Sequence, residues 1–479
     1  MILALCMSAV RSEEPLLLGR VEMPSLTGFL SSASPFMEKI SQGSSAKLIL
    51  GATALAFAPD YKDFDVTQPL AVYIYAGPSE KNNEPYSVIV VSKKSEKLPP
   101  KMQITGQQLY TKTFGDKVML SESQEILNSI TAIPEPLKTA DNQISASFHP
   151  AEYIKKFPQD FQDIRHEIVK GIASSGKRRL DVNGIKILNL KLAYAEKAIQ
   201  QMETISLTIS ADKEIMNISL SFKAEDGSAF AEFIEAQKKS DAPCPSPASA
   251  KLISAAGRIE MTEALRNTLS EIAEGIAVEE ADDESQMKYV STLQLLFKTF
   301  EGSFSFYMDN LPSRNNARFT LTTLTMQDKK AASAILESLT QTSKQIDGNT
   351  YSLASVLTGP RTESKLICSV DDNKVKMLSG PLSEKEALEQ LSVNKDNKSE
   401  NFGPACIAIL GKKNPSEGQI NFKDDCAIVS LGLTPETLKP LLPDNALLNP
   451  PSAPPSQPGQ KKNKKKRIQL NPADFMNPR

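Results

Sequence analysis

The chain is poor in the side chains on which hydrolytic and metal-dependent enzymes most often rely. It has two histidines, His149 and His166, and five cysteines in 479 residues. No two cysteines have the CxxC spacing of a zinc knuckle, and there is no GxSxG nucleophile elbow. No Cys/His/Asp arrangement for nucleophilic catalysis follows from the spacing. We therefore predict a non-catalytic protein without a resident cofactor or metal.

The sequence also lacks a long apolar run. None reaches the roughly 18 residues that cross a bilayer. Residues Ile2 to Val10 (ILALCMSAV) form a short apolar run that ends in small residues before Arg11. This resembles the later part of a secretory signal without its basic n-region, so either the true start codon lies upstream or the run is a buried first strand. We expect residues 1–14 to be a signal segment and the protein to be exported to the periplasm or cell surface.

Positive charge is concentrated in one short run near the C-terminus. The chain has 55 basic and 57 acidic side chains, a formal net charge of −2. Six of the cations gather in one short run: Lys461, Lys462, Lys464, Lys465, Lys466 and Arg467. The body is therefore acidic, which argues against nucleic-acid binding through a broad basic face.

The basic run follows a Pro-rich stretch that cannot form helix or sheet, so residues 442–479 read as a disordered linker and tail. We expect the run to bind an anionic envelope polymer, a lipid surface or an acidic protein in a salt-dependent way. A purely solubilising tail and docking on the acidic body are the alternatives. Nothing in the sequence identifies a small-molecule ligand or the oligomeric state.

Four cysteines remain if the signal segment is removed: Cys244, Cys368, Cys406 and Cys426. An even number in an exported protein permits two disulfides in three connectivities. Cys406 and Cys426 lie on two short apolar strand candidates, ACIAIL and CAIVSLGL, that resemble hairpin neighbours. We predict this pair first, with buried thiols in a strand core as the equal alternative.

Internal similarity is the strongest organising signal. GRVEMPSLTGFL at Gly19 to Leu30 returns as GRIEMTEALRNTL at Gly257 to Leu269. An order of helix, helix, hairpin and helix is predicted for residues 143–241 and again for 257–342. A smaller echo links GDKVML, starting at Gly115, with DNKVKML, starting at Asp372. These patterns indicate an ancestral duplication.

The predicted fold class is α+β, with duplicated units of antiparallel strands that carry helices on one face. We expect a first unit at 19–136, a second at 143–241, a third at 257–342 that repeats the second, and C-terminal strands with a helix at 343–441.

Three weak motifs leave other functions open. Residues 171–178 (GIASSGKR) match a nucleotide-binding P-loop except that Arg178 replaces the Ser or Thr that holds magnesium. The stretch also ends a helix instead of following a strand. Ser44 to Lys47 satisfies SxxK without its partner motifs SDN and KTG, and the acidic loop 279–284 lacks the form of a calcium loop. A nucleotide-binding protein or enzyme using 171–178, or a cytoplasmic nucleic-acid-binding protein, is the alternative function.

The strand-to-helix starts carry one resemblance. They are Val21-Glu22-Met23-Pro24-Ser25-Leu26, Ile259-Glu260-Met261 and Ser147-Phe148-His149-Pro150. The pattern resembles that of uncharacterised exported repeat-containing proteins of planctomycete and verrucomicrobial bacteria, in which such a start precedes amphipathic helices and hairpins. The resemblance implies export and a repeated architecture, and no activity. We therefore expect a binding or scaffolding protein of the bacterial cell envelope, tethered by its basic tail.

Overall fold

Antiparallel strands and helices make up the described part of the chain, so the predicted mixed α+β class is confirmed. The computed structural model describes residues 15–41, 63–65, 67–77, 84–104, 107–137, 142–174, 182–241, 244–245, 247, 252–279, 284–311, 318–340, 344–347, 350–353, 365–392, 399–400, 405–410 and 415–438. All of them belong to one compact unit, Met1–Leu441. Twenty of the described strands form a single sheet.

The first group of strands comes from the N-terminal quarter of the chain. In order across the sheet it contains β5 (Lys101–Ile104), β6 (Gln107–Phe114), β7 (Lys117–Ser121), β4 (Pro85–Lys93), β3 (Leu70–Ala76) and β1 (Leu17–Met23). The short β2 (Phe64–Asp65) also pairs with β4. All of these pairings are antiparallel.

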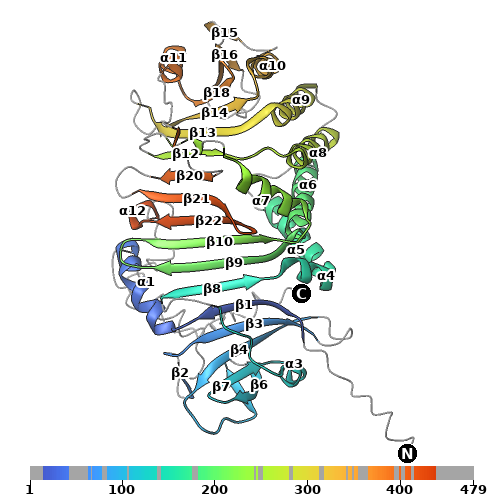
Figure 1. Ribbon diagram of the computed structural model, residues 1–479, viewed down its shortest axis with the longest axis vertical. Coiled ribbons are helices and arrows are strands. Elements are labelled where there is room, and N and C mark those ends of the chain that lie inside the picture. The colour runs from blue at the N-terminus through green and yellow to red at the C-terminus, as the bar shows by residue number, and fades with distance from the viewer. Residues whose placement is uncertain are drawn as a thin grey trace, which may run out of the picture. The chain divides into compact units, whose positions relative to one another are not determined.

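The second group continues the sheet from β1. It contains β8 (Gln143–Phe148), β9 (Met202–Ala211), β10 (Met216–Ala224), β22 (Cys426–Leu433), β21 (Ser416–Lys423) and β20 (Ala405–Leu410), in that order. Figure 1 shows the red strands of the C-terminal region inserted between the green strands of the middle of the chain. The second group is thus built from two segments far apart in sequence.

The third group continues from β20. It contains β12 (Ile253–Arg258), β13 (Phe300–Asn310), β14 (Arg318–Met326), β18 (Lys374–Gly380), β17 (Lys365–Asp371), β16 (Thr350–Leu353) and β15 (Lys344–Asp347). Two further strands, β11 (Cys244–Pro245) and β19 (Ser399–Glu400), pair only with each other among the described residues.

The chain fills each group in the same order. Leaving out the short β2, three strands lie side by side, and later strands return so that the last of them pairs with the third; there are three such later strands in the first and second groups and four in the third. Thus β7, β22 and β18 lie beside β4, β10 and β14. The second group is completed only after the chain has formed the third.

The hairpin before each of these last strands has a two-residue turn. Its strands pair Phe114 with Lys117, Asp371 with Lys374 and Lys423 with Cys426. The first turn residue has a positive φ each time, 59° at Gly115, 54° at Asp372 and 53° at Asp424. Glycine and aspartate are among the few residues that enter this region readily.

A helix follows the last strand of each group: α3 (Gln124–Ser129), α12 (Pro435–Leu438) and α11 (Glu384–Ser392). Ser123 begins α3 by accepting a hydrogen bond from the backbone N–H of Ile126 at 3.3 Å. At α11, Ser383 Oγ accepts from the N–H of Glu386 at 3.3 Å, and the carboxylate of Glu386 accepts from the N–H of Ser383 at 2.8 Å. This reciprocal pair is a capping box.

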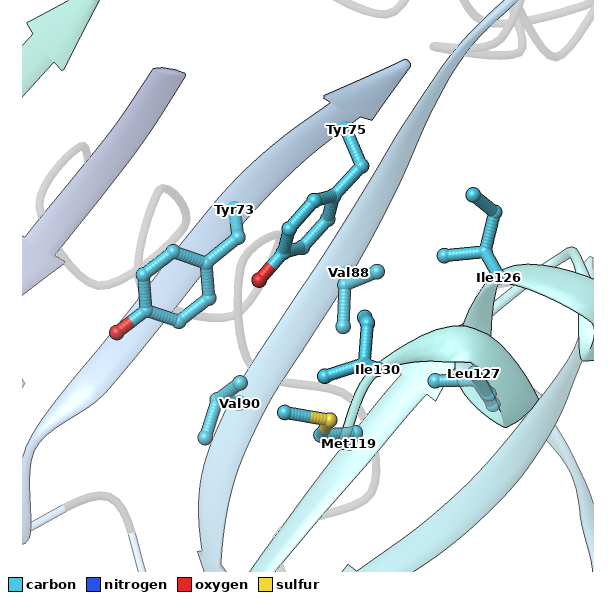
Figure 2. Packing of buried hydrophobic residues seen from close by; sticks show 8 residues of the cluster. All are labelled: Tyr73, Tyr75, Val88, Val90, Met119, Ile126, Leu127 and Ile130. Atoms are coloured by element: carbon cyan, nitrogen blue, oxygen red, sulfur yellow. The ribbon is translucent and has the colours of Figure 1, made fainter. Parts of the chain in front are cut away.

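The core of the first group shows how such a helix covers the sheet. Ile126, Leu127 and Ile130 of the α3 segment face the strands, as Figure 2 shows. They pack against alternate residues of β3, β4 and β7: Tyr73, Tyr75, Val88, Val90 and Met119. The strands supply one apolar face by their period of two, and the short helix covers it.

The third group carries helices on both faces, which corrects the expectation of a single covered face for this part of the sheet. Ile367 and Leu378 lie opposite each other and pack with α11. Val370 and Val375 form another such pair, on the other face because each lies three residues from the first, and pack with α10 (Lys329–Thr340). Both faces of β17 and β18 are apolar, so both need a cover.

Five of the remaining helices contact one another in a series. In contact order they are α5 (Pro158–Ser174), α6 (Val182–Ile199), α8 (Glu263–Glu279), α9 (Glu284–Thr299) and α10. α4 (Pro150–Lys156) lies against β9 and β1, and α7 (Ala229–Lys239) against β10 and β21. On the other side of the strands in Figure 1, α1 (Leu26–Ser41) contacts β9 and α12.

Candidate binding surface

Uncharged hydroxyl and amide side chains form a straight row across five strands of the second group. The direct cross-strand pairs are Ser145 with Thr208, Thr208 with Ser219, Ser219 with Ser430 and Ser430 with Gln419. We call these five residues the hydroxyl row. Strands lie about 4.8 Å apart, so the row is about 19 Å long. Ser147, Ser206 and Ser221 form a shorter parallel row on the same face.

The strand alternation gives the opposite face an apolar character. Its matching row contains Ala146, Leu207, Leu220, Val429 and Ile420, which also pair directly across the strands. The second group of strands is therefore polar on one face and apolar on the other, as expected for antiparallel strands.

Burial changes along the hydroxyl row. Ser145 is 7% exposed, the three residues from Thr208 to Ser430 are half-buried, and Gln419 is exposed. Hydroxyl groups both donate and accept hydrogen bonds. The row therefore offers a neutral hydrogen-bonding surface that is buried at β8 and becomes exposed to solvent toward β21.

A buried charged cluster borders the polar face at β1. Arg20 Nε donates to Ser147 Oγ at 3.2 Å, and its Nη1 donates to the carbonyl of Glu135 at 2.7 Å. The carboxylate of Glu22, only 5% exposed as a residue, lies 3.6 Å from Arg20 Nη1. Its other oxygen accepts a hydrogen bond from the backbone N–H of Leu137 at 2.6 Å. This cluster fastens the segment around residue 136 to the sheet.

Tyr73 completes the cluster as a neutral group. Its hydroxyl donates to Glu22 Oε1 at 3.5 Å. Burial raises the pKa of Tyr73 well above its usual value, and the charge of Glu22 raises it further. The phenol is thus held in its protonated form, as a structural donor.

The related sequence in β12 uses its Arg and Glu in a similar way. Arg258 Nη1 donates to Glu301 Oε1 at 3.2 Å and to Ser303 Oγ at 3.1 Å on β13. Glu260 is tied to the end of α7, because its N–H donates to Gln237 Oε1 at 2.7 Å and its carboxylate accepts from Ser240 at 3.1 Å. In both places the arginine binds a neighbouring strand and the glutamate fastens a connecting segment. These contacts give both residues a structural role, while Arg258 Nε is buried without a hydrogen-bond partner in the described structure.

A shallow hollow lies at the start of α1. It has a volume of about 520 Å³ and is open to solvent. Its lining is small and uncharged: Pro24, Ser25, Thr27, Gly28, Ser31, Thr67, Gln68 and Pro69. Ser25 Oγ accepts a hydrogen bond from the N–H of Gly28 at 3.0 Å. One backbone N–H at the start of α1 is therefore already bound by Ser25 of the same segment. The lining of the hollow contains no charged group that could select a ligand.

The predicted Cys406–Cys426 disulfide is not formed, since neither cysteine takes part in a disulfide in the structure. The strands that carry them, β20 and β22, are not neighbours, because β21 lies between them. Their side chains also point to opposite faces. Cys406 lies opposite Ile420, whereas Cys426 lies opposite Lys423, three residues further along β21.

Other residues considered from the sequence are scattered or lie outside the described part. The basic tail, Lys461 to Arg467, and the segment Ser44 to Lys47 are outside it. Gly171 is exposed in the last turn of α5, where no helix begins, and residues 175–178 are not described. His149 precedes α4 and its Nδ1 lies 3.4 Å from Thr204 Oγ1, whereas His166 is exposed on α5.

The hydroxyl row was not foreseen from the sequence. Its signal is the alternation of Ser and Thr with Ile and Leu in residues 204–210 and 217–221, a pattern that by itself predicts only half-buried strands.

Within the described ranges, no three His, Cys, Asp or Glu side chains come together as a metal site. No helix in those ranges is long and apolar enough to span a membrane. Comparisons with protein-family models, curated proteins and solved structures find no match.

Proposed function

We propose that the protein is a non-catalytic exported protein that binds or scaffolds polymers of the bacterial cell envelope. In this proposal the hydroxyl row meets a neutral, polyhydroxylated stretch of the polymer, and the basic tail holds the protein to anionic groups. The observation that carries the proposal is the continuous, uncharged and partly exposed row across five strands.

The chemistry of the row supports a sugar-like partner over a charged one. Ser, Thr and Gln can match both donors and acceptors, as sugar hydroxyls require. Each neutral hydrogen bond contributes only about 0.5–1.5 kcal/mol, so binding depends on many contacts along an extended polymer. The basic tail adds a salt-sensitive contribution of different origin.

Binding of the full chain to purified cell-wall material tests the proposal at low and high salt. Removing Lys461 to Arg479 should abolish the salt-sensitive part of the retention. A triple variant of the row, Thr208→Val with Ser219→Ala and Ser430→Ala, should reduce the salt-insensitive part by about tenfold or more, as the loss of three hydrogen bonds predicts.

A matched control replaces hydroxyls outside the row. Thr320→Val with Thr322→Val changes two half-buried threonines of β14 and should leave retention unchanged. Unchanged retention of both the row variant and the tail deletion would contradict the proposal.

We further infer that the three strand groups arose by duplication. The shared strand order, the matching two-residue turns and the helix after each last strand support this. If it is correct, residues 15–137 should fold alone, because they contain a whole group. Dispersed amide resonances and a cooperative unfolding transition are expected of this fragment, and an unfolded fragment would argue against a self-sufficient unit.

A further inference from the structure

Two cysteines lie where the chain leaves the second strand group and where it returns. Cys244 is in β11, shortly after α7, and Cys406 is in β20. The chain between them forms the whole third group. The pairing of β11 with β19, in which Cys244 lies opposite Glu400, brings the outgoing and returning segments together.

Both cysteines adjoin the same strand. β11 lies against β12 and β13, and Cys406 lies directly opposite Gly257 of β12. Gly257 has no side chain to fill the space beside Cys406. The corresponding residue of β1, Gly19, lies opposite Phe148, and a β-carbon there would come within 3.2 Å of that ring. In β12 the residue opposite the glycine is a cysteine instead.

Electrostatics agree with this proximity. Burial raises the pKa of Cys406, and the neighbouring thiol of Cys244 raises it further. Cys244 is completely buried.

The other two cysteines are poor partners. Cys368 is buried in the α10 core of the third group, where burial raises its pKa to about 12. Cys426 is separated from Cys406 by β21 and faces the other side of the sheet. Among the possible partners of Cys406, Cys244 is therefore the favoured one.

We propose that Cys244 and Cys406 form a disulfide when the protein folds under oxidising conditions. The bond links the two chain segments that connect the third strand group to the second. With glutathione disulfide as oxidant, one cysteine thiolate attacks it and releases one glutathione. The second thiolate then attacks the mixed disulfide and releases another. Two protein thiols are oxidised to one disulfide, and one glutathione disulfide is reduced to two glutathione molecules.

The bond should form during folding, because Cys244 is completely buried in the folded chain and the raised pKa of the half-buried Cys406 disfavours its thiolate. The test therefore unfolds the reduced full-length chain in urea and refolds it in an oxidising or a reducing glutathione buffer. Thiols are then blocked with N-ethylmaleimide, and the chain is digested without reduction for mass spectrometry. A peptide pair joining Cys244 to Cys406 is expected only after oxidising refolding.

Single variants decide which cysteines are joined. Cys368→Ser and Cys426→Ser should retain the cross-linked pair, whereas Cys244→Ser should lose it. The bonded chain should also unfold at a higher urea concentration than the reduced chain, because a long closed loop restricts the unfolded state. Secretion of the chain into a bacterial periplasm, followed by the same mass analysis, provides a second route if refolding fails.

Alkylation of Cys244 and Cys406 after both routes, or a dominant Cys406–Cys426 link, would overturn the inference. The outcome is independent of the proposed envelope binding, because the glutathione buffer supplies the oxidant in the test tube. A failure to bind cell-wall material would leave the disulfide result unaffected.

Discussion

Arg20 reaches from β1 to β8, where its Nε donates a hydrogen bond to Ser147 Oγ at 3.2 Å. The same guanidinium lies 3.6 Å from the buried carboxylate of Glu22. We expect Glu22→Ala to lower the free energy of unfolding by about 3 kcal/mol, because it leaves Arg20 without its carboxylate and the N–H of Leu137 without its acceptor. Urea denaturation of the full chain measures this loss.

Glu22→Gln provides the comparison, because an amide oxygen can still accept from Leu137. We expect it to cost less than Glu22→Ala, and replacing the exposed Glu122 by Ala should cost almost nothing. Equal urea midpoints for Glu22→Ala and the wild-type chain would show that the cluster of Arg20 and Glu22 contributes no stability.

Gly115→Val should destabilise the first strand group by about 1–2 kcal/mol, because a β-branched residue is strained at a φ of 59°. A β-carbon at this position meets no atom within 4 Å, so the cost comes from the backbone alone. Gly115→Asp is the matched control. Aspartate occupies the same turn position at Asp372 and Asp424, and this variant should lose less stability in thermal unfolding than the valine variant.

Lys112→Met should weaken the attachment of α3. Lys112 Nζ donates to the carbonyl oxygens of Leu127 at 2.7 Å and Ile130 at 2.6 Å, at the end of the helix. Hydrogen bonds from a charged donor are the stronger kind, so a loss of about 2 kcal/mol is expected in urea denaturation. Lys97→Met, at an exposed lysine, should have no comparable effect; similar losses for both would remove the special role of Lys112.

Stability should fall at strongly alkaline pH. Burial raises the pKa of Tyr153 to about 12, and Asp160, which accepts a hydrogen bond from its hydroxyl at 3.2 Å, adds to the effect. Between pH 10, the usual value, and about 12 the unfolded chain binds fewer protons than the folded chain. The contribution is therefore complete below pH 10 and is lost as the pH rises toward 12.

Tyr153→Phe should show a shallower decline of the urea midpoint between pH 9.5 and 11.5, as a test of that linkage. Tyr194→Phe, at a half-buried tyrosine of α6, is the control. An unchanged decline in the Tyr153 variant would assign the alkaline sensitivity elsewhere, for example to Tyr307, whose pKa is also raised to about 12 by burial and by Asp309.

Local patterns predicted local elements well. Ile164, Ile168 and Ile172 recur at helical spacing after Pro158, which predicts a helix there, and α5 covers Pro158–Ser174. The same period did not reveal what lies against the helix. Ile164 and Ile168 are 50% and 40% exposed. Periodicity shows which side chains share a face, whereas burial depends on what the rest of the chain places there.

Pairing between distant segments was beyond the sequence. Cys406 and Cys426 looked like neighbours because β21 between them, SEGQINFK, is polar and contains a glycine. This gives a weak strand signal. The hydroxyl row was missed for a related reason, since Ser430 joins Ser219 only through the pairing of β22 with β10 across more than 200 residues. The domain boundaries drawn from the sequence stay a prediction.

The late arrival of β22 beside β10 has a consequence during synthesis. When β10 leaves the ribosome, its outer edge has no partner until residues 426–433 follow. At about 5–20 residues per second, this delay lasts about 10–40 s. The third group has time to fold in that interval, and the nascent chain would carry an open edge with its risk of aggregation. Export machinery or a chaperone that shields β10 would therefore act on a chain that is still being made.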